Sequence, residues 1–168
     1  MPGVVLRSAT IDDADALRQI YNHEVLTATS TFDLVTRSRA QQEEWITARS
    51  GAFSAIVAVD GDDPTGAVIG FAALSAYKDR AAYSTTVEDS VYVDRNRGGG
   101  GVGTLLLTRL VEIAAESGFH AVMARIEASG EASRALHAKC GFELVGIERQ
   151  VGRKFNRWLD VAVMQRLL

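Results

Sequence analysis

Two residues have side chains suited to proton transfer near neutral pH. Glu88 lies in the run TTVEDSVYV, where strand-forming residues surround it, and a carboxylate in such a run is either exposed to solvent or functional. His137 lies in ALHAKCGF, and histidine is the side chain whose ordinary pKa falls in the physiological range. Each also has a simpler interpretation: Glu88 as a solvent-exposed strand residue, and His137 as a surface or packed helix residue. Together they are candidates for acid–base chemistry.

The run GGGGVG at 98–103 is the second feature that could do chemistry. A flexible linker is one interpretation, but no second domain-sized segment lies on either side of it. A dinucleotide fingerprint is another, because Gly98, Gly100 and Gly103 satisfy G-x-G-x-x-G and Glu127 follows on the next predicted strand. That fold needs several successive βαβ units. The pattern therefore favours a pyrophosphate cradle at a helix N-terminus, where glycines let the anion approach the backbone amides.

Hydrophobic periodicity predicts the elements that position these residues. Strands are expected at 4–9, 53–60, 67–77, 84–93, 120–128, 142–150 and 157–168. Helices are expected from Thr10 to about Leu26, at 38–50, after the glycines as far as Ser117, and at 131–140. This order predicts an α/β (α+β) fold with a mixed sheet, in which an antiparallel meander precedes one right-handed parallel βαβ crossover.

Alternation along the strand at 84–93 divides its side chains between two faces. One face receives Thr86, Glu88, Ser90 and Tyr92, and the other receives Val87, Asp89, Val91 and Val93.

Size and composition narrow the classes of protein. The 168 residues suggest a single domain over 1–168, and the formal net charge of −3 provides no basic field for nucleic acid. No apolar run reaches the length of a membrane span, and MPGVVLRSATIDDAD has no signal-peptide pattern, so we expect a cytoplasmic protein. The one cysteine, Cys140, fits a reducing compartment. We expect no metal, no nucleic-acid partner and no membrane partner.

Four segments together resemble the GNAT acyltransferases, and within them the phosphinothricin/methionine sulfoximine N-acetyltransferase group. They are TVEDSVYV (86–93), GGGGVG (98–103), SRALHAKCGFE (133–143) and VGRKFNRWLDVAVMQ (151–165). The resemblance extends over nearly the whole chain and implies a GNAT-like acyl-CoA N-acyltransferase fold, with acetyl-CoA as cosubstrate and a homodimeric assembly.

The resemblance also implies which residues bind acetyl-CoA. The pantetheine would pair with the strand at Val91, Tyr92 and Val93, and the pyrophosphate would lie on Gly98, Gly99, Gly100, Gly101, Val102, Gly103 and Thr104. Gly130 and Ser133 would contact the other arm of the cofactor. The sequence departs from the family pattern at Gly98, where Arg or Gln is usual, and at Gly130, where Asn is common. Each change removes a potential hydrogen bond, for which Arg97 or Arg134 is a possible substitute.

The implied reaction is acetyl transfer to the primary amine of a small molecule, by direct attack in a ternary complex without an acyl-enzyme. Glu88 would serve as base and His137 as the partner acid or base, and the sequence leaves open which group does which. Cys140 is expected to be a packed residue rather than a nucleophile.

An amino-acid analogue such as phosphinothricin, methionine sulfoximine or methionine sulfone is the acceptor that the resemblance implies. Its candidate contacts are Phe32, Tyr77, Lys78, Tyr83, Lys154 and Phe155. Ser84 stands where the group frequently has Arg. Two alternatives remain open: a CoA-binding protein of this fold with little or no catalysis, and a protein or polyamine N-acetyltransferase.

Overall fold

A computed structural model describes residues 3–63, 65–97 and 100–168. Its single sheet has the strand order β1-β2-β3-β4-β5-β7-β6. The strands are β1 Val4–Ser8, β2 Ala55–Asp60, β3 Val68–Ala76, β4 Thr86–Val93, β5 Ala121–Glu127, β6 Glu143–Lys154 and β7 Arg157–Leu167. The helices are α1 Ala14–Thr27, α2 Arg39–Thr47, α3 Val102–Glu116 and α4 Glu131–Lys139, with short 3₁₀ turns at Ile11–Asp13, Ala81–Tyr83 and Arg95–Arg97.

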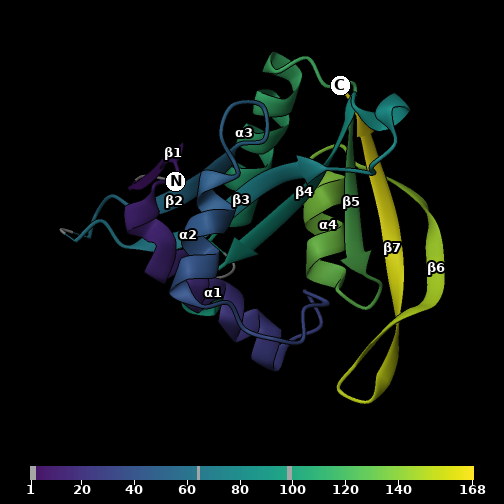
Figure 1. The fold of residues 1–168 in the computed structure, drawn as a ribbon, viewed down its shortest axis with the longest axis horizontal. Coiled ribbons are helices and arrows are strands. Elements are labelled where there is room, and N and C mark those ends of the chain that lie inside the picture. Colours follow the sequence, from purple (N-terminus) through teal and green to yellow (C-terminus); the bar gives the residue numbers. More distant parts are fainter. Residues whose placement is uncertain (1–2, 64, 98–99) are drawn as a thin grey trace.

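The sheet changes direction once. Strands β1 to β4 pair antiparallel in chain order, β4 and β5 pair in parallel, and β5, β7 and β6 are again antiparallel. The connection between the two parallel strands runs through α3 (Figure 1). The predicted mixed sheet, with a meander followed by one parallel crossover, is therefore confirmed.

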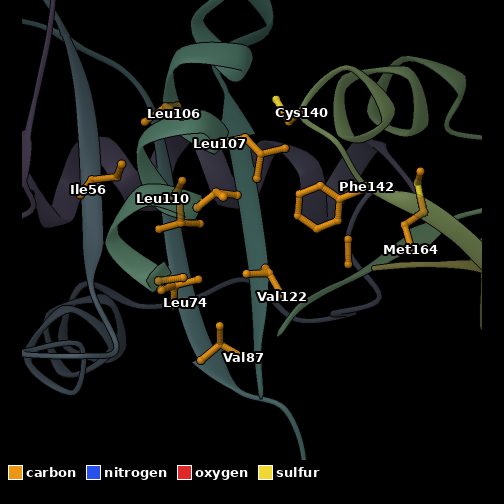
Figure 2. Close-up of a cluster of buried hydrophobic side chains, with 14 of the residues drawn as sticks. Ile56, Leu74, Val87, Leu106, Leu107, Leu110, Val122, Cys140, Phe142 and Met164 are labelled. Carbon is orange, nitrogen blue, oxygen red and sulfur yellow. The ribbon is translucent and has the colours of Figure 1, made fainter. Parts of the chain in front are cut away.

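Helices cover the two faces of the sheet with separate cores. On the face covered by α3 and α4, here called the α3 face, Leu106 and Leu110 of α3 belong to one buried cluster with Val87 and Val122 (Figure 2). On the other face, here called the α1 face, Leu17 of α1 and Ile46 of α2 pack with Phe71 of β3. The alternation predicted for β4 is confirmed, because Val87, Val91 and Val93 belong to the first core and Tyr92 to the second.

The helices begin and end where local chemistry favours it. At α2, Ser38 accepts the amide hydrogen of Gln41 at 3.2 Å, and the Gln41 side chain accepts that of Ser38 at 2.8 Å, which completes a capping box. At α3, Gly101 has a φ of 81°, a conformation that favours glycine, and makes no side-chain cap. Over the described ranges, no helix combines the length and the apolar character needed to cross a membrane.

Strand β6 is longer than predicted, since it continues from Glu143 to Lys154 instead of ending at Gln150. Its pairing with β7 is irregular between Glu148 and Gly152, and Gln150 has a φ of 54°. The Asp160 carboxylate accepts the Gln150 amide hydrogen at 2.8 Å, which secures the irregularity. The chain thus resumes pairing after a bulge that the residue pattern did not reveal.

Candidate active site

A cavity of about 910 Å³ opens where β4 and β5 separate. Their parallel pairing covers only three pairs and ends at Glu88 and Met123, and beyond this point the two strands diverge (Figure 1). Side chains from both faces of the sheet line the cavity: Glu88, Ser90, Arg125 and Glu127 from the α1 face, and Asp89, Val91, Ile126 and His137 from the α3 face. The cavity therefore extends through the gap between the strands, so two reactants can approach from opposite faces.

Glu88 lies at the apex of this gap on the α1 face. Burial raises the pKa of its carboxyl; the positive charge of Arg125 opposes the shift, and the negative charges of Asp89 and Glu148 add to it. A carboxylate with a raised pKa is a better proton acceptor than an ordinary exposed glutamate. Glu88 is therefore suited to take a proton from an amine in the cavity.

His137 approaches the gap from the α3 face, on α4. Its side chain is buried, with Nε2 2.8 Å from Asp89 Oδ2 and Nδ1 2.7 Å from the carbonyl oxygen of Ser133. Burial by itself would lower the pKa of His137, but the hydrogen bond and charge of Asp89, with the Ser133 carbonyl, raise it above its ordinary value. Glu88 and His137 thus both line the cavity but occupy opposite faces of the sheet.

The exposed edge of β4 can pair with an extended ligand. The amide of Asp94 donates to Ile69 of β3 at 2.9 Å, so the backbone groups of Tyr92 also face β3, and those of Val91 and Val93 face the gap. No β5 partner reaches this stretch of the described strand. The backbone groups of Val91 and Val93 are therefore accessible to an extended ligand, and their role in binding pantetheine stays a prediction. The Tyr92 side chain instead packs against Tyr21 and Phe71 on the α1 face.

The N-terminus of α3 forms one end of the cavity. Gly101, Val102 and Gly103 line it, and the first turn of the helix has no side-chain cap, so its amides are available to an anion. A side chain at Gly103 would fill the space, because a Cβ there would lie 3.2 Å from Leu136 Cδ2. These features fit a diphosphate. Gly98 and Gly99 lie outside the described residues, whereas Gly100 is exposed and Thr104 is half-buried.

The other cofactor candidates lie at the start of α4. Gly130 and Ser133 both line the cavity. The two arginines considered as substitutes for missing hydrogen bonds already have partners: Arg97 contacts the Asp60 carboxylate at 2.6 Å, and Arg134 donates to the Ala128 carbonyl at 3.1 Å. Arg97 also lines the cavity and is partly exposed, so it can reach a bound anion by exchanging its partner.

The segment 28–32, which follows α1, closes the cavity on the α1 face. Phe32 lines the cavity and packs directly against Gly152 of β6, a contact that leaves no room for a side chain at that position. Glu24 at the end of α1 is buried and binds Arg95 through two hydrogen bonds of 2.7 and 2.8 Å. The Ser30 hydroxyl donates to Glu24, so the segment is attached to α1 at one end and packs on the β6–β7 hairpin through Phe32.

The structure separates the remaining acceptor candidates from this cavity. Tyr77 and Tyr83 stack edge to face with ring centroids 5.5 Å apart, and the Lys78 ammonium lies 4.9 Å from the Tyr77 ring. This cluster belongs to the β3–β4 connection and does not line the cavity. Phe155, half-exposed at the turn between β6 and β7, does not line it either.

Lys154 differs most from the expectation of a substrate contact. Only 4% of the residue is exposed, and its ammonium donates to the carbonyl oxygen of Thr31 at 2.8 Å. Burial lowers its pKa, although the charges of Asp33 and Glu24 partly oppose this. Lys154 thus links the β6–β7 hairpin to the segment 28–32 through a buried hydrogen bond.

Asp89 and Arg125 are among the cavity residues to which the sequence pattern assigned no role. Asp89, the partner of His137, shares a strand face with three valines, and an inward carboxylate among them signals a need for a partner. Arg125 alternates with buried residues in AVMARIE and lies on the same face as Glu88, with Nη2 2.8 Å from Glu148 Oε1. The alternation of each strand thus showed an unusual charged residue at Asp89 and at Arg125, but it did not indicate what either residue does.

The described residues contain no group of three or more His, Cys, Asp and Glu side chains arranged to hold a metal ion. Cys140 is buried in the core of the α3 face, where its sulfur lies 3.9 Å from the Thr108 hydroxyl. It is a packed residue, as expected.

Known proteins share both this sequence pattern and this fold. The profile of the acetyltransferase (GNAT) domain family matches residues 6–163. A phosphinothricin N-acetyltransferase from Streptomyces coelicolor is 37% identical over 173 residues, with all of both chains covered. An L-methionine sulfoximine/L-methionine sulfone acetyltransferase from Pseudomonas paraeruginosa is 36% identical, covering 95% of this chain and 92% of its own.

A solved structure of a phosphinothricin acetyltransferase from Sinorhizobium meliloti, in complex with acetyl-CoA, superposes with a TM-score of 0.92. It is 37% identical, and the match covers 99% of this chain and 89% of that one.

Proposed function

Because the chain belongs to the GNAT acetyltransferase family and is an acetyl-CoA-dependent enzyme, we propose that its acceptor is the primary amine of a small amino-acid analogue. Phosphinothricin, methionine sulfoximine and methionine sulfone are the specific candidate acceptors, because the similar enzymes are named as acetyltransferases of these compounds. The observation that carries the proposal is the cavity between β4 and β5. In this cavity an uncapped helix N-terminus and an unpaired strand edge lie together with the half-buried carboxylate of Glu88.

Glu88 acts as the base in this proposal. A protonated amine has no lone pair for attack, so it must transfer a proton before it reaches the thioester carbon. Glu88 lies at the apex of the gap on the α1 face, whereas the diphosphate cradle and His137 lie toward α3 and α4. The amine therefore enters from the α1 face and acetyl-CoA from the α3 face. This arrangement supports direct attack in a ternary complex, without an acyl-enzyme.

Arg125 is the proposed anchor for the carboxylate of the acceptor. It lies on β5 two residues beyond Met123, the pairing partner of Glu88, and projects from the same face. Its guanidinium is partly exposed and lines the cavity, so it can bind a carboxylate while it retains or exchanges Glu148. Phe32 would cover the acceptor side chain. Tyr77, Lys78 and Tyr83 would contribute to an acceptor site only from outside this cavity.

A polyamine is the second candidate acceptor, and Glu127 favours it. This carboxylate is buried, lines the cavity and projects from the same face as Glu88. In the described part of the chain its partners are Thr29 and Ser129, which are not cationic. A molecule with two amines could be held between Glu88 and Glu127.

We also propose that the protein is a homodimer and acts in the cytoplasm. The 168 residues act as a single acetyltransferase domain in the cytoplasm, where a free buried Cys140 is stable. The β6–β7 hairpin exposes large apolar side chains, including 61% of Val145 and 58% of Trp158, which suits a homodimer contact. Size-exclusion chromatography with light scattering tests the dimer, and a monomer at micromolar concentration overturns that part.

Calorimetric titration with acetyl-CoA, followed by an acceptor panel, tests the function. The panel contains methionine sulfoximine, methionine sulfone, phosphinothricin, spermidine and a lysine peptide. Micromolar binding and the highest kcat/KM with an amino-acid analogue support the proposal. Preference for spermidine supports the second candidate, preference for the peptide overturns both, and binding without turnover on any acceptor identifies a CoA-binding protein.

A further inference from the structure

The imidazole of His137 has hydrogen-bond acceptors at both of its nitrogens. Nδ1 faces the carbonyl oxygen of Ser133 at 2.7 Å, and a carbonyl oxygen can only accept, so Nδ1 carries a hydrogen. Nε2 faces a carboxylate oxygen of Asp89 at 2.8 Å, and an ionised carboxylate also only accepts. With Asp89 ionised, both nitrogens bear hydrogens, and the ring in this arrangement is an imidazolium with no lone pair to accept a proton.

Asp89 is the charged group responsible for this state. Asp89 and His137 are 9% and 4% exposed, and Phe142 packs edge to face with the imidazole at 5.0 Å between centroids. On α4 itself, Glu131 and Lys139 are exposed, and the Arg134 guanidinium donates to Ala128. Glu88 of β4, with Arg125 and Glu127 of β5, projects from the opposite face of the sheet, whereas Ile126 faces α4. From α3, the uncharged Leu107 packs in the same core, beside the buried Cys140.

The pair also borders the cavity. Both residues line it, and Asp89 immediately follows Glu88, where the parallel pairing ends. Asp89 uses Oδ2 to hold the imidazole, and within the described ranges its other carboxylate oxygen takes part in no hydrogen bond. The shared proton therefore lies at the edge of the space through which the thioester must pass.

We propose that Asp89 is a positioning residue that keeps His137 protonated, so that the Asp89–His137 pair supplies the proton to the departing CoA thiolate. This rests on the proposed function. It excludes His137 as the base and assigns that role to Glu88 alone, a choice that the residue types left open. The two ionisable units then act on opposite reactants, from opposite faces of the sheet.

The protons and electrons balance as follows. Glu88 takes one proton from the ammonium, and water removes it; the amine lone pair then forms the C–N bond at the thioester carbon. A second proton leaves the nitrogen to Glu88 as the C–S bond breaks, and the electron pair of that bond goes to sulfur. The thiolate takes the proton shared by His137 and Asp89. The neutral imidazole that remains regains a proton from solvent after CoA leaves, and Glu88 releases its second proton to solvent.

Side-chain ¹H–¹⁵N NMR titration of the wild-type protein without acetyl-CoA tests the pair independently of catalysis. The chain has three histidines, and the spectrum of His137→Gln identifies the signal of His137. We expect an imidazolium that persists to a pH above the ordinary titration range of histidine, and its loss in Asp89→Asn, where burial remains without a counter-charge. A neutral His137 in the wild type at pH 6, or an unchanged titration in Asp89→Asn, overturns the inference, and the wild-type result decides this even if the variant fails to fold.

Steady-state kinetics test the second part of the proposal, that the Asp89–His137 pair donates the proton to the CoA thiolate. Asp89→Asn is expected to lower kcat at least tenfold with the KM for acetyl-CoA within threefold, and to move the alkaline limb of the kcat profile to lower pH. Asp89→Asn/His137→Gln is expected to be no slower than His137→Gln alone, because the residues act as one unit. Asp12→Asn, on an exposed carboxylate, is the control. Multiplicative losses in the double variant, or full activity of Asp89→Asn, overturn the inference. A wild type without turnover on any acceptor overturns the proposed function instead.

Discussion

Glu88 and Asp89 are adjacent in the chain but project from opposite faces of β4, where its pairing with β5 ends. The alternation of a strand thus directs one carboxylate toward α1 and the next toward α4. Asp89 binds His137 at 2.8 Å, whereas Glu88 shares its face with Arg125. Two neighbouring residues can therefore serve two reactants on opposite sides of one sheet.

Glu88→Gln should abolish most of the turnover and leave substrate binding intact. The amide has nearly the shape of the carboxylate but cannot accept a proton from an ammonium, and general-base catalysis contributes roughly 10²–10⁴-fold. We expect kcat to fall by about that factor, with acetyl-CoA affinity measured by calorimetry within threefold of wild type. Glu44→Gln, on the exposed face of α2, is the matched control. Wild-type kcat in Glu88→Gln would remove Glu88 from the mechanism.

The pH dependence of kcat/KM should report the surroundings of Glu88. Only its ionised form accepts a proton, so activity rises as pH increases through its pKa, and burial raises that pKa above the ordinary range of glutamate. The positive charge of Arg125 lowers the pKa of Glu88, and the negative charge of Glu148 raises it. Arg125→Gln should therefore move the acid limb to higher pH, and Glu148→Gln should move it to lower pH.

Measured pH–rate profiles of the three proteins decide this point. The opposite directions are the control, because a general loss of folding would affect both variants alike. If the two limbs move in the same direction, or neither moves, the acid limb belongs to another group.

Arg125→Gln should also weaken binding of the acceptor without weakening binding of acetyl-CoA. A hydrogen bond to a charged group contributes about 1.5–3 kcal/mol, which corresponds to a roughly 10–150-fold rise in the acceptor KM. The KM for acetyl-CoA should stay within threefold. The wild type and Arg125→Gln should acetylate equally well a primary amine that lacks the carboxylate. Equal sensitivity of the two acceptors would show that Arg125 does not bind the carboxylate.

The sequence predicted what depends on local pattern and missed what depends on distant contacts. Alternation in TVEDSVYV placed Glu88 and Asp89 correctly, because a strand leaves each side chain only two directions. It did not identify Asp89 as the partner of His137, since the two residues are 48 positions apart and meet only when α4 packs on the sheet. Lys154 was proposed as an acceptor contact because the resemblance implies one in the loop between the last two strands. Its contact with Thr31 spans 123 positions, beyond any local pattern.

Gly103→Ala should separate cofactor affinity from stability. The added methyl would lie 3.2 Å from Leu136 Cδ2, between α3 and α4, where Gly103 and Leu136 both line the cavity. Alanine is a better helix former by about 1 kcal/mol, which offsets the close contact, so the free energy of unfolding should change little. The dissociation constant for acetyl-CoA should rise at least tenfold, about 1.4 kcal/mol. Gly146→Ala, where a Cβ meets open space, should leave it unchanged.

Lys154→Met should loosen the segment 28–32 that closes the cavity on the α1 face. Methionine retains the apolar part of the side chain, but the Thr31 carbonyl loses the donor that lies 2.8 Å away, and an unsatisfied buried acceptor costs about 1–3 kcal/mol. Hydrogen exchange should accelerate at residues 28–32. The acceptor KM should rise severalfold, because Phe32 lies on this segment, with the KM for acetyl-CoA within twofold. Lys139→Met, on the exposed face of α4, should change none of these quantities. If instead the acceptor KM rises while exchange at 28–32 stays slow, Lys154 contacts the acceptor directly.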